Sequence, residues 1–214
     1  MKRTLLIFVI GLAFTFKLEA KKVEGLIFFE KDTVKVTFEI PVSFFSEEVD
    51  YQKLQYKVKY YGTDGKKIVL KPEQAKEIQF KDGYQEIRML SRENTLGGGN
   101  IFFGSSNIFL KLEMDGSIKM FKYFYTQTSP GMTVGGGGMA GGTIMVGGGS
   151  YNVEKFVLQK GNSELKRPRG LFFRKDMIEY FSDCPELAKK IENKDYTSDD
   201  LDAIVRYYNS QCGK

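Results

Sequence analysis

The sequence predicts an α+β protein: an antiparallel β-sandwich or partly closed barrel of about nine strands, followed by a three-helix tail. Three observations predict this class. Apolar and charged residues alternate with a period of two in the first part of the chain, Asp-Gly pairs interrupt the alternating runs, and the apolar spacing becomes helical from Leu171. We therefore expect a signal peptide at 1–20, a β domain at 21–166 and a helical tail at 171–214 that packs on the β domain.

The first twenty residues have the layout of a secretory signal peptide. Lys2 and Arg3 precede an apolar run from Leu5 to Phe16, and Ala20 is a small residue suited to cleavage. The run is too short for a membrane-spanning helix, which needs about 20 residues. No later apolar run reaches that length. We expect the mature chain to be exported, to the periplasm or the medium, with no transmembrane span after the signal is removed.

Two kinds of pattern predict the strands. The run at 34–40 alternates Val, Val, Phe and Ile with Lys, Thr and Glu, and the run at 56–60 alternates Tyr and Val with lysines. Period two with a polar outer face is typical of a half-buried strand. The Asp-Gly pairs at 82–83 and 115–116 predict two-residue hairpin turns, because both turn positions need a positive φ.

These turns predict strand registers. A turn at 82–83 would place Ile78 opposite Ile87. A turn at 115–116 would place Leu110 opposite Phe121. One face of the second hairpin then carries most of the large apolar side chains, namely Ile108, Leu110, Leu112, Met114, Phe121 and Tyr123. We expect that face to be the core side.

The tail shows helical spacing and capping signals. Met177, Ile178 and Phe181 share one helical face, and Asp183 is the expected cap of a second helix with Pro185 in its first turn. Either residue of the Thr-Ser pair at 197–198 is the expected cap of the third helix. That helix has an apolar stripe made of Leu201, Ile204, Val205 and Tyr208, which we expect to pack against the sheet.

The only two cysteines, Cys184 and Cys212, lie in this tail. A short connection makes the second and third helices antiparallel, so the start of one lies near the end of the other. In an exported chain this arrangement predicts a disulfide, worth about 3 to 4 kcal/mol. The alternatives are a reactive thiol or a metal site. Because the chain has no histidine and two cysteines do not complete a zinc site, we expect no metal and no cofactor.

The stretch from 131 to 150 is half glycine. It matches the dinucleotide pattern G-x-G-x-x-G, but in so glycine-rich a run the match is nearly automatic, and no βαβ unit surrounds it. No lysine stands where a P-loop needs one. We expect a long loop between two strands. Its methionines, Met132, Met139 and Met145, are candidate partner contacts.

The residue types exclude several functions. Without histidine, Ser-His-Asp and Cys-His catalysis are impossible, and no G-x-S-x-G motif occurs. A glycosidase carboxylate pair stays open, because such residues are distant in sequence. The net charge of +5 is mild and does not suggest nucleic-acid binding. Basic residues between 166 and 175, including Arg167, Arg169 and Arg174, are candidate contacts for lipid phosphates or acidic glycans; the alternative is a solvated linker.

The tail stretch FSDCPEL, from Phe181 to Leu187, follows a strand-rich region that contains LKPEQAKEIQF. Together they resemble small exported proteins of unknown function from Bacteroidota-type bacteria. The resemblance implies location and architecture, and no catalytic residues. We therefore expect a non-enzymatic binding or structural module of the cell envelope that meets an envelope component or glycan. The alternative is a carboxylate-dependent hydrolase acting on envelope glycans.

Overall fold

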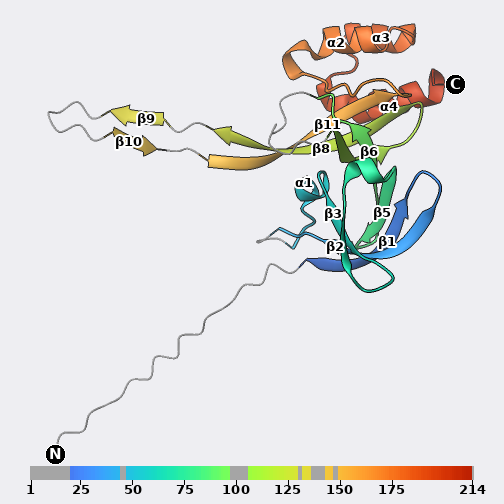
Figure 1. The fold of residues 1–214 in the computed structure, drawn as a ribbon. Coiled ribbons are helices and arrows are strands. Elements are labelled where there is room, and N and C mark those ends of the chain that lie inside the picture. The colour runs from blue at the N-terminus through green and yellow to red at the C-terminus, as the bar shows by residue number, and fades with distance from the viewer. Residues whose placement is uncertain are drawn as a thin grey trace, which may run out of the picture.

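A computed structural model describes residues 20–43, 47–96, 106–129, 132–135, 143–146 and 149–213. Nine strands form one antiparallel sheet, and helices of the tail cover part of it (Figure 1). The predicted α+β class is confirmed. The sheet is open, with β4 at one edge and β11 at the other. The predicted signal peptide lies outside the described residues, except for Ala20.

The strand order is β11-β8-β7-β6-β5-β1-β2-β3-β4, so the chain first builds one meander and then returns to place β5 beside β1. The first strands are β1 (Lys21–Phe28), β2 (Thr33–Ile40), β3 (Val58–Tyr61), β4 (Lys67–Leu70), β5 (Glu77–Asp82) and β6 (Gln85–Glu93). The later strands are β7 (Asn107–Met114), β8 (Ile118–Ser129), β9 (Met132–Gly135), β10 (Thr143–Val146) and β11 (Gly149–Lys160). The α-helices are α1 (Tyr51–Leu54), α2 (Phe173–Tyr180), α3 (Pro185–Glu192) and α4 (Leu201–Gln211), and the 3₁₀ turns are η1 (Pro72–Gln74), η3 (Gly170–Phe172) and η4 (Ser198–Asp200).

The alternation in β2 produces the predicted half-buried strand. Val36, Phe38 and Ile40 are buried in a core formed by strands β1 to β7. Gly25 of β1 lies against this core, where a Cβ atom would approach the Gln79 carbonyl oxygen to 2.1 Å. Only glycine therefore allows β1 and β5 to pair at this point.

Both predicted hairpins form, but their registers differ from the prediction. Ile78 pairs with Met89 rather than with Ile87, because the turn is Gly83-Tyr84 and Asp82 stays in the strand. Gly83 takes the positive φ of +61°. The partner of each residue shifts by two positions, which keeps every side chain on its face of the sheet.

The register of the second hairpin also differs from the prediction by two positions, and a bulge shifts it further near the turn. Leu112 pairs with Phe121, and an irregularity after Leu112 brings Met114 opposite Met120. Met114 therefore packs with the tail instead of with the predicted face. The opposite face is also buried, because the tail covers Ile118 and Met120. Of the other predicted core residues, Ile108, Leu110, Phe121 and Tyr123 share one buried cluster, and the partly buried Leu112 packs against it.

Helix α4 packs on β8, and α2 and α3 lie outside α4 and share one buried cluster with it and with residues of β8 and β11 (Figure 1). Leu201, Ile204, Val205 and Tyr208 are all buried, in a cluster with Leu158 of β11. Among the described helices, none combines the length and apolar composition needed to cross a bilayer.

The predicted caps of the tail are right in one case and wrong in the other. Thr197 caps η4, with reciprocal bonds to Asp200. Asp183 does not cap α3; its carboxylate accepts hydrogen bonds from Lys160 Nζ at 2.7 Å and from the Tyr208 hydroxyl at 2.6 Å. These charge-assisted bonds connect the tail to the end of β11, and they outcompete the cap.

The glycine-rich stretch contains more structure than a loop. Met132–Gly135 and Thr143–Val146 pair as the antiparallel strands β9 and β10, which continue the β8–β11 ribbon outward (Figure 1). The expected loop is therefore wrong for these eight residues. Met132 and Met145 lie on the two strands, whereas Met139 lies outside the described residues.

Replacing residues 130–148 with a two-residue turn should leave the melting temperature nearly unchanged. Ser129 and Gly149 already pair across the ribbon, and loop-closure entropy depends weakly on length. Thermal unfolding followed by circular dichroism measures the effect. A large fall in the melting temperature would mean instead that the removed segment stabilises the fold.

Candidate functional site

The basic segment before α2 ends in an exposed apolar turn. In η3 the Leu171 side chain is 97% exposed and that of Phe172 is 54% exposed. Fully burying such a side chain is worth about 1.5–3 kcal/mol, so two adjacent exposed ones forgo a sizeable gain. Arg174 and Lys175 follow in the first turn of α2, and both are exposed. We call Leu171, Phe172, Arg174 and Lys175 the tail patch.

An ion pair beneath the tail patch fixes its shape. Arg169 donates to both carboxylate oxygens of buried Asp176, at 2.9 Å from Nε and 3.0 Å from an Nη. The hydrogen bonds from Arg169 hold the pKa of Asp176 below its usual range. The Arg169 guanidinium also lies 5.0 Å from the Phe172 ring centroid. Two-point ion pairing and the ring contact together order the exposed turn before any partner arrives.

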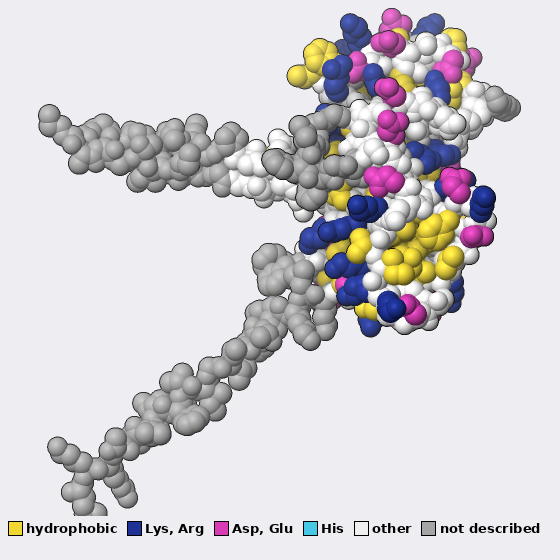
Figure 2. Space-filling view, in the orientation of Figure 1, with side chains coloured by type: hydrophobic (Ala, Val, Ile, Leu, Met, Phe, Trp, Pro, Cys, Tyr) yellow, Lys and Arg dark blue, Asp and Glu magenta, His cyan; other side chains and the backbone are white. Residues whose placement is uncertain are grey.

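A groove of ≈ 910 Å³ continues the tail patch toward η4. Its apolar lining includes Ile178 and Tyr196, and Lys194 adds a cation. Figure 2 shows hydrophobic side chains projecting at the α2 end of the tail, with Lys and Arg beside them and acidic side chains close by. Neither Arg174 nor Lys175 forms an ion pair with a described carboxylate. Glu179 and Glu192 also line the groove, so the cations available to an anionic partner are those of the tail patch, next to its apolar side chains.

The structure does not bring all the predicted contact residues together. Arg169 supports the tail patch and Arg174 belongs to it. Arg167 acts elsewhere: burial raises the pKa of Tyr123 to about 12, and the Arg167 charge opposes that rise, which places Arg167 near the sheet. The arm that carries Met132 and Met145 projects away from the helices (Figure 1).

The two cysteines form the predicted disulfide. Cys184 and Cys212 are joined, with their Cα atoms 5.8 Å apart. Cys184 is 1% exposed and belongs to the core between the tail and the sheet. The bond connects the start of α3 to the end of α4, so its role is structural.

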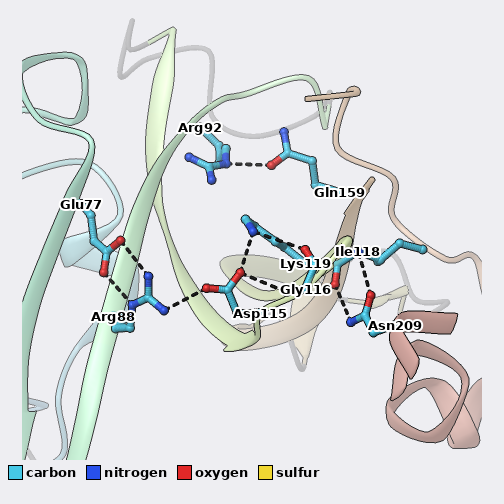
Figure 3. A network of polar contacts seen from close by, with 9 residues as sticks. All are labelled: Glu77, Arg88, Arg92, Asp115, Gly116, Ile118, Lys119, Gln159 and Asn209. Carbon is cyan, nitrogen blue, oxygen red and sulfur yellow. Dashed lines mark hydrogen bonds and ion pairs between the residues drawn. The ribbon is translucent and has the colours of Figure 1, made fainter. Parts of the chain in front are cut away.

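A chain of charges, not predicted from the sequence, crosses the sheet (Figure 3). Arg88 of β6 makes two bonds to Glu77 of β5, at 2.7 and 3.0 Å, and a third to Asp115 at 2.9 Å. Lys119 Nζ lies 2.5 Å from the other oxygen of Asp115. The hydrogen bond from Lys119, followed by that from Arg88, keeps the pKa of Asp115 low. Both carboxylates of this network, those of Glu77 and Asp115, are paired with a cation, which favours a structural role.

Asn209 of α4 binds β8 close to this network. Its amide accepts from the Ile118 N–H at 2.8 Å and donates to the Ile118 carbonyl at 2.9 Å (Figure 3). The contact is close, because a Cβ on Gly116 would meet the Asn209 side chain at 2.5 Å. The sequence does not predict these two hydrogen bonds, because 91 positions separate Asn209 from Ile118.

A second hollow, of ≈ 710 Å³, lies between η1, β5 and β6 and is polar. Three carboxylates, those of Glu30, Glu73 and Glu77, are among its lining residues. Two of them are ion-paired: Glu30 lies 2.8 Å from Lys76 Nζ, and Glu77 binds Arg88. The oxygens of these two carboxylates are therefore already engaged by cations, which suits a structural role.

The search for relatives found nothing: no protein-family model, curated protein or solved structure matches this chain. Within the described residues, no group of three His, Cys, Asp or Glu side chains is placed to hold a metal ion. The tail patch is therefore the candidate site that the geometry best defines.

Proposed function

We propose that this protein is an exported, non-enzymatic binding module of the cell envelope that attaches through the tail patch to an anionic lipid surface. The observation that carries the proposal is the 97% exposure of Leu171 beside exposed Phe172, on an ordered turn next to cations. The disulfide between Cys184 and Cys212 agrees with an oxidising location.

The chemistry of the tail patch suits the boundary of a bilayer. Leu and Phe side chains enter the region between headgroups and acyl chains, while Arg and Lys remain at the level of the phosphates. Each cation near an anionic surface contributes about 1 kcal/mol. Because Arg169 and Asp176 already order the turn, attachment costs little conformational entropy.

The alternative, a hydrolase of envelope glycans, has weaker support. It needs one carboxyl that stays protonated near a second carboxylate. In the polar hollow, Glu30 is ion-paired with Lys76 and Glu77 with Arg88, so cations already engage both carboxylates. These ion pairs favour the binding module.

Reversing the charges of the tail patch should abolish attachment. We expect the Arg174→Glu/Lys175→Glu variant to bind phosphatidylglycerol vesicles at least about tenfold more weakly than the unchanged protein. The Leu171→Glu variant should lose binding to a similar extent, since a carboxylate replaces the inserted side chain. Vesicle co-sedimentation at low and high salt measures both effects, with phosphatidylcholine vesicles as the uncharged comparison.

The matched control is Lys31→Glu/Lys81→Glu, which makes the same change in net charge at two exposed positions, one in the β1–β2 turn and one on β5. This control should retain vesicle binding. Equal losses in both double variants would show that net charge alone drives binding and would overturn the tail patch as the site. Binding to a soluble acidic glycan, with no vesicle binding, would replace the lipid surface with a glycan.

A further inference from the structure

Strand β11 forms one edge of the sheet over an unusual length. Its inner side pairs with β8 along all 12 residues from Gly149 to Lys160. On its outer side Leu158 pairs with Lys166 through two bonds, of 2.9 and 2.8 Å. Across the rest of that side, from 149 to 157, no described residue pairs with the strand. The opposite edge strand, β4, has only four residues.

The free edge has little of the usual protection against pairing. Natural edges are shortened or interrupted by proline, lysine or bulges. Between 149 and 157 the strand has no proline, and Glu154 and Lys155 are its only charged residues. Two large side chains on it are solvent-exposed, Tyr151 at 51% and Phe156 at 39%.

The outer half of the β8–β11 ribbon also lacks a third strand. β7 pairs with β8 no further out than Lys122, and the side chains at 126–129 and 149–152 are exposed. Figure 1 shows the ribbon projecting beyond the other strands. Two-stranded ribbons are marginally stable in water, so an added strand would stabilise this part of the molecule.

We propose that β11 pairs antiparallel with β11 of a second copy of this chain, about a two-fold axis at Val153. The register follows from the free edge. An isologous pair uses all of residues 149–157 when Gly149 faces Val157 of the second copy, and the midpoint is then Val153. This inference does not depend on the tail patch.

The hydrogen-bonding direction agrees with this register. The N–H and C=O groups of Leu158 point outward, to Lys166, and the direction alternates along a strand, so those of Asn152, Glu154 and Phe156 point outward too. Asn152 then faces Glu154 of the second copy and exchanges both backbone bonds with it. Val153 faces Val153 of the second copy in a non-hydrogen-bonded pair, where the two Cα atoms approach to about 4.5 Å.

The side chains are also compatible. Lys155 lies opposite Tyr151 of the second copy, and Glu154 lies opposite Asn152, so no like charges face each other. An axis one residue further along would place two Glu154 carboxylates opposite each other. The pairing would cover Tyr151, and a cation–π contact with Lys155 would add to the attraction.

Cysteine cross-linking tests the register directly. Val153→Cys should give a disulfide-linked dimer under mild oxidation, visible on a non-reducing gel. Lys155→Cys is the matched control on the same strand; its sulfur would lie about four residues, or ~13 Å, from its counterpart, too far for a bond. A dimer with Lys155→Cys and none with Val153→Cys would overturn the register.

Solution mass tests the association itself. Sedimentation equilibrium should give about twice the mass of one chain, which is 24.4 kDa with the predicted signal peptide and less after its removal, at tens of micromolar protein. Asn152→Pro removes one outward N–H per copy and should weaken the dimer at least about tenfold, whereas Asn152→Ala keeps that N–H and should leave the dimer intact. A monomeric unchanged protein, or equal weakening by both variants, would overturn edge pairing.

Discussion

Replacing Gln55 with leucine should lower the free energy of unfolding by about 2–4 kcal/mol. Gln55 has no exposed surface, although it follows the short helix α1 in a loop. Its amide donates from Nε2 to the Phe124 carbonyl at 2.7 Å and accepts from the Phe124 N–H at 2.6 Å. The backbone carbonyl of Gln55 accepts a third hydrogen bond, from the Phe109 N–H at 2.9 Å.

These bonds occupy the place where β7 and β8 separate. The two strands pair at Lys111 and Lys122, near their shared turn, and no longer pair where Phe109 and Phe124 lie. Gln55 supplies the missing partners on both sides of that gap. Leucine fills a similar volume but cannot bond, so two backbone groups of Phe124 would lose their partners at about 1–3 kcal/mol each.

Urea denaturation followed by circular dichroism measures the Gln55→Leu effect. Gln52→Leu is the matched control: the same change on α1 removes an exposed hydrogen bond of 2.8 Å to Thr126. An exposed bond of this kind should cost less than about 0.5 kcal/mol. Equal effects of the two substitutions would mean that Gln55 does not support the gap between the strands.

Local patterns predicted much of this fold because the forces that form its elements are local. Period-two alternation placed β2, and helical spacing placed the buried stripe of α4. The hairpin faces were right where the registers shifted by two, and wrong only for Met114, which a bulge moves to the other face. Antiparallel helices also placed the two cysteines together.

The sequence did not predict the contacts between residues that are far apart along the chain. Gln55 and Phe124 are 69 positions apart, and Arg88 meets Asp115 across 27. Which of several glutamines becomes buried depends on where two strands separate, and this is set by tertiary packing. Leu171 shows the same limit: its apolar character fitted the start of a helical pattern, yet it lies exposed in a 3₁₀ turn. Composition indicated the basic segment, and only the structure showed the apolar turn that makes it a candidate site.

Removing the disulfide should produce the other large effect. Cross-linking a loop with a sequence separation of 28 lowers the entropy of the unfolded chain and is worth about 3–4 kcal/mol. We therefore expect Cys212→Ser to lower the melting temperature by roughly 6–15 °C. Cys212 is the better position to change, because it is partly exposed, whereas a serine at buried Cys184 would add an unpaired hydroxyl.

The loss should begin at α3. This helix has eight residues, of which Leu187 and Ile191 are buried, so packing alone stabilises it weakly. The longer α4 buries Ile204 and Val205 completely and is also bound through Asn209, so it should stay on the sheet. Hydrogen exchange in the Cys212→Ser variant should therefore show faster exchange of α3 amides than of α4 amides. The control adds reductant: the melting temperature of the unchanged protein should fall, and that of the variant should not. Two free thiols in unreduced protein from an oxidising compartment, or equal melting temperatures with and without reductant, would contradict this role of the bond.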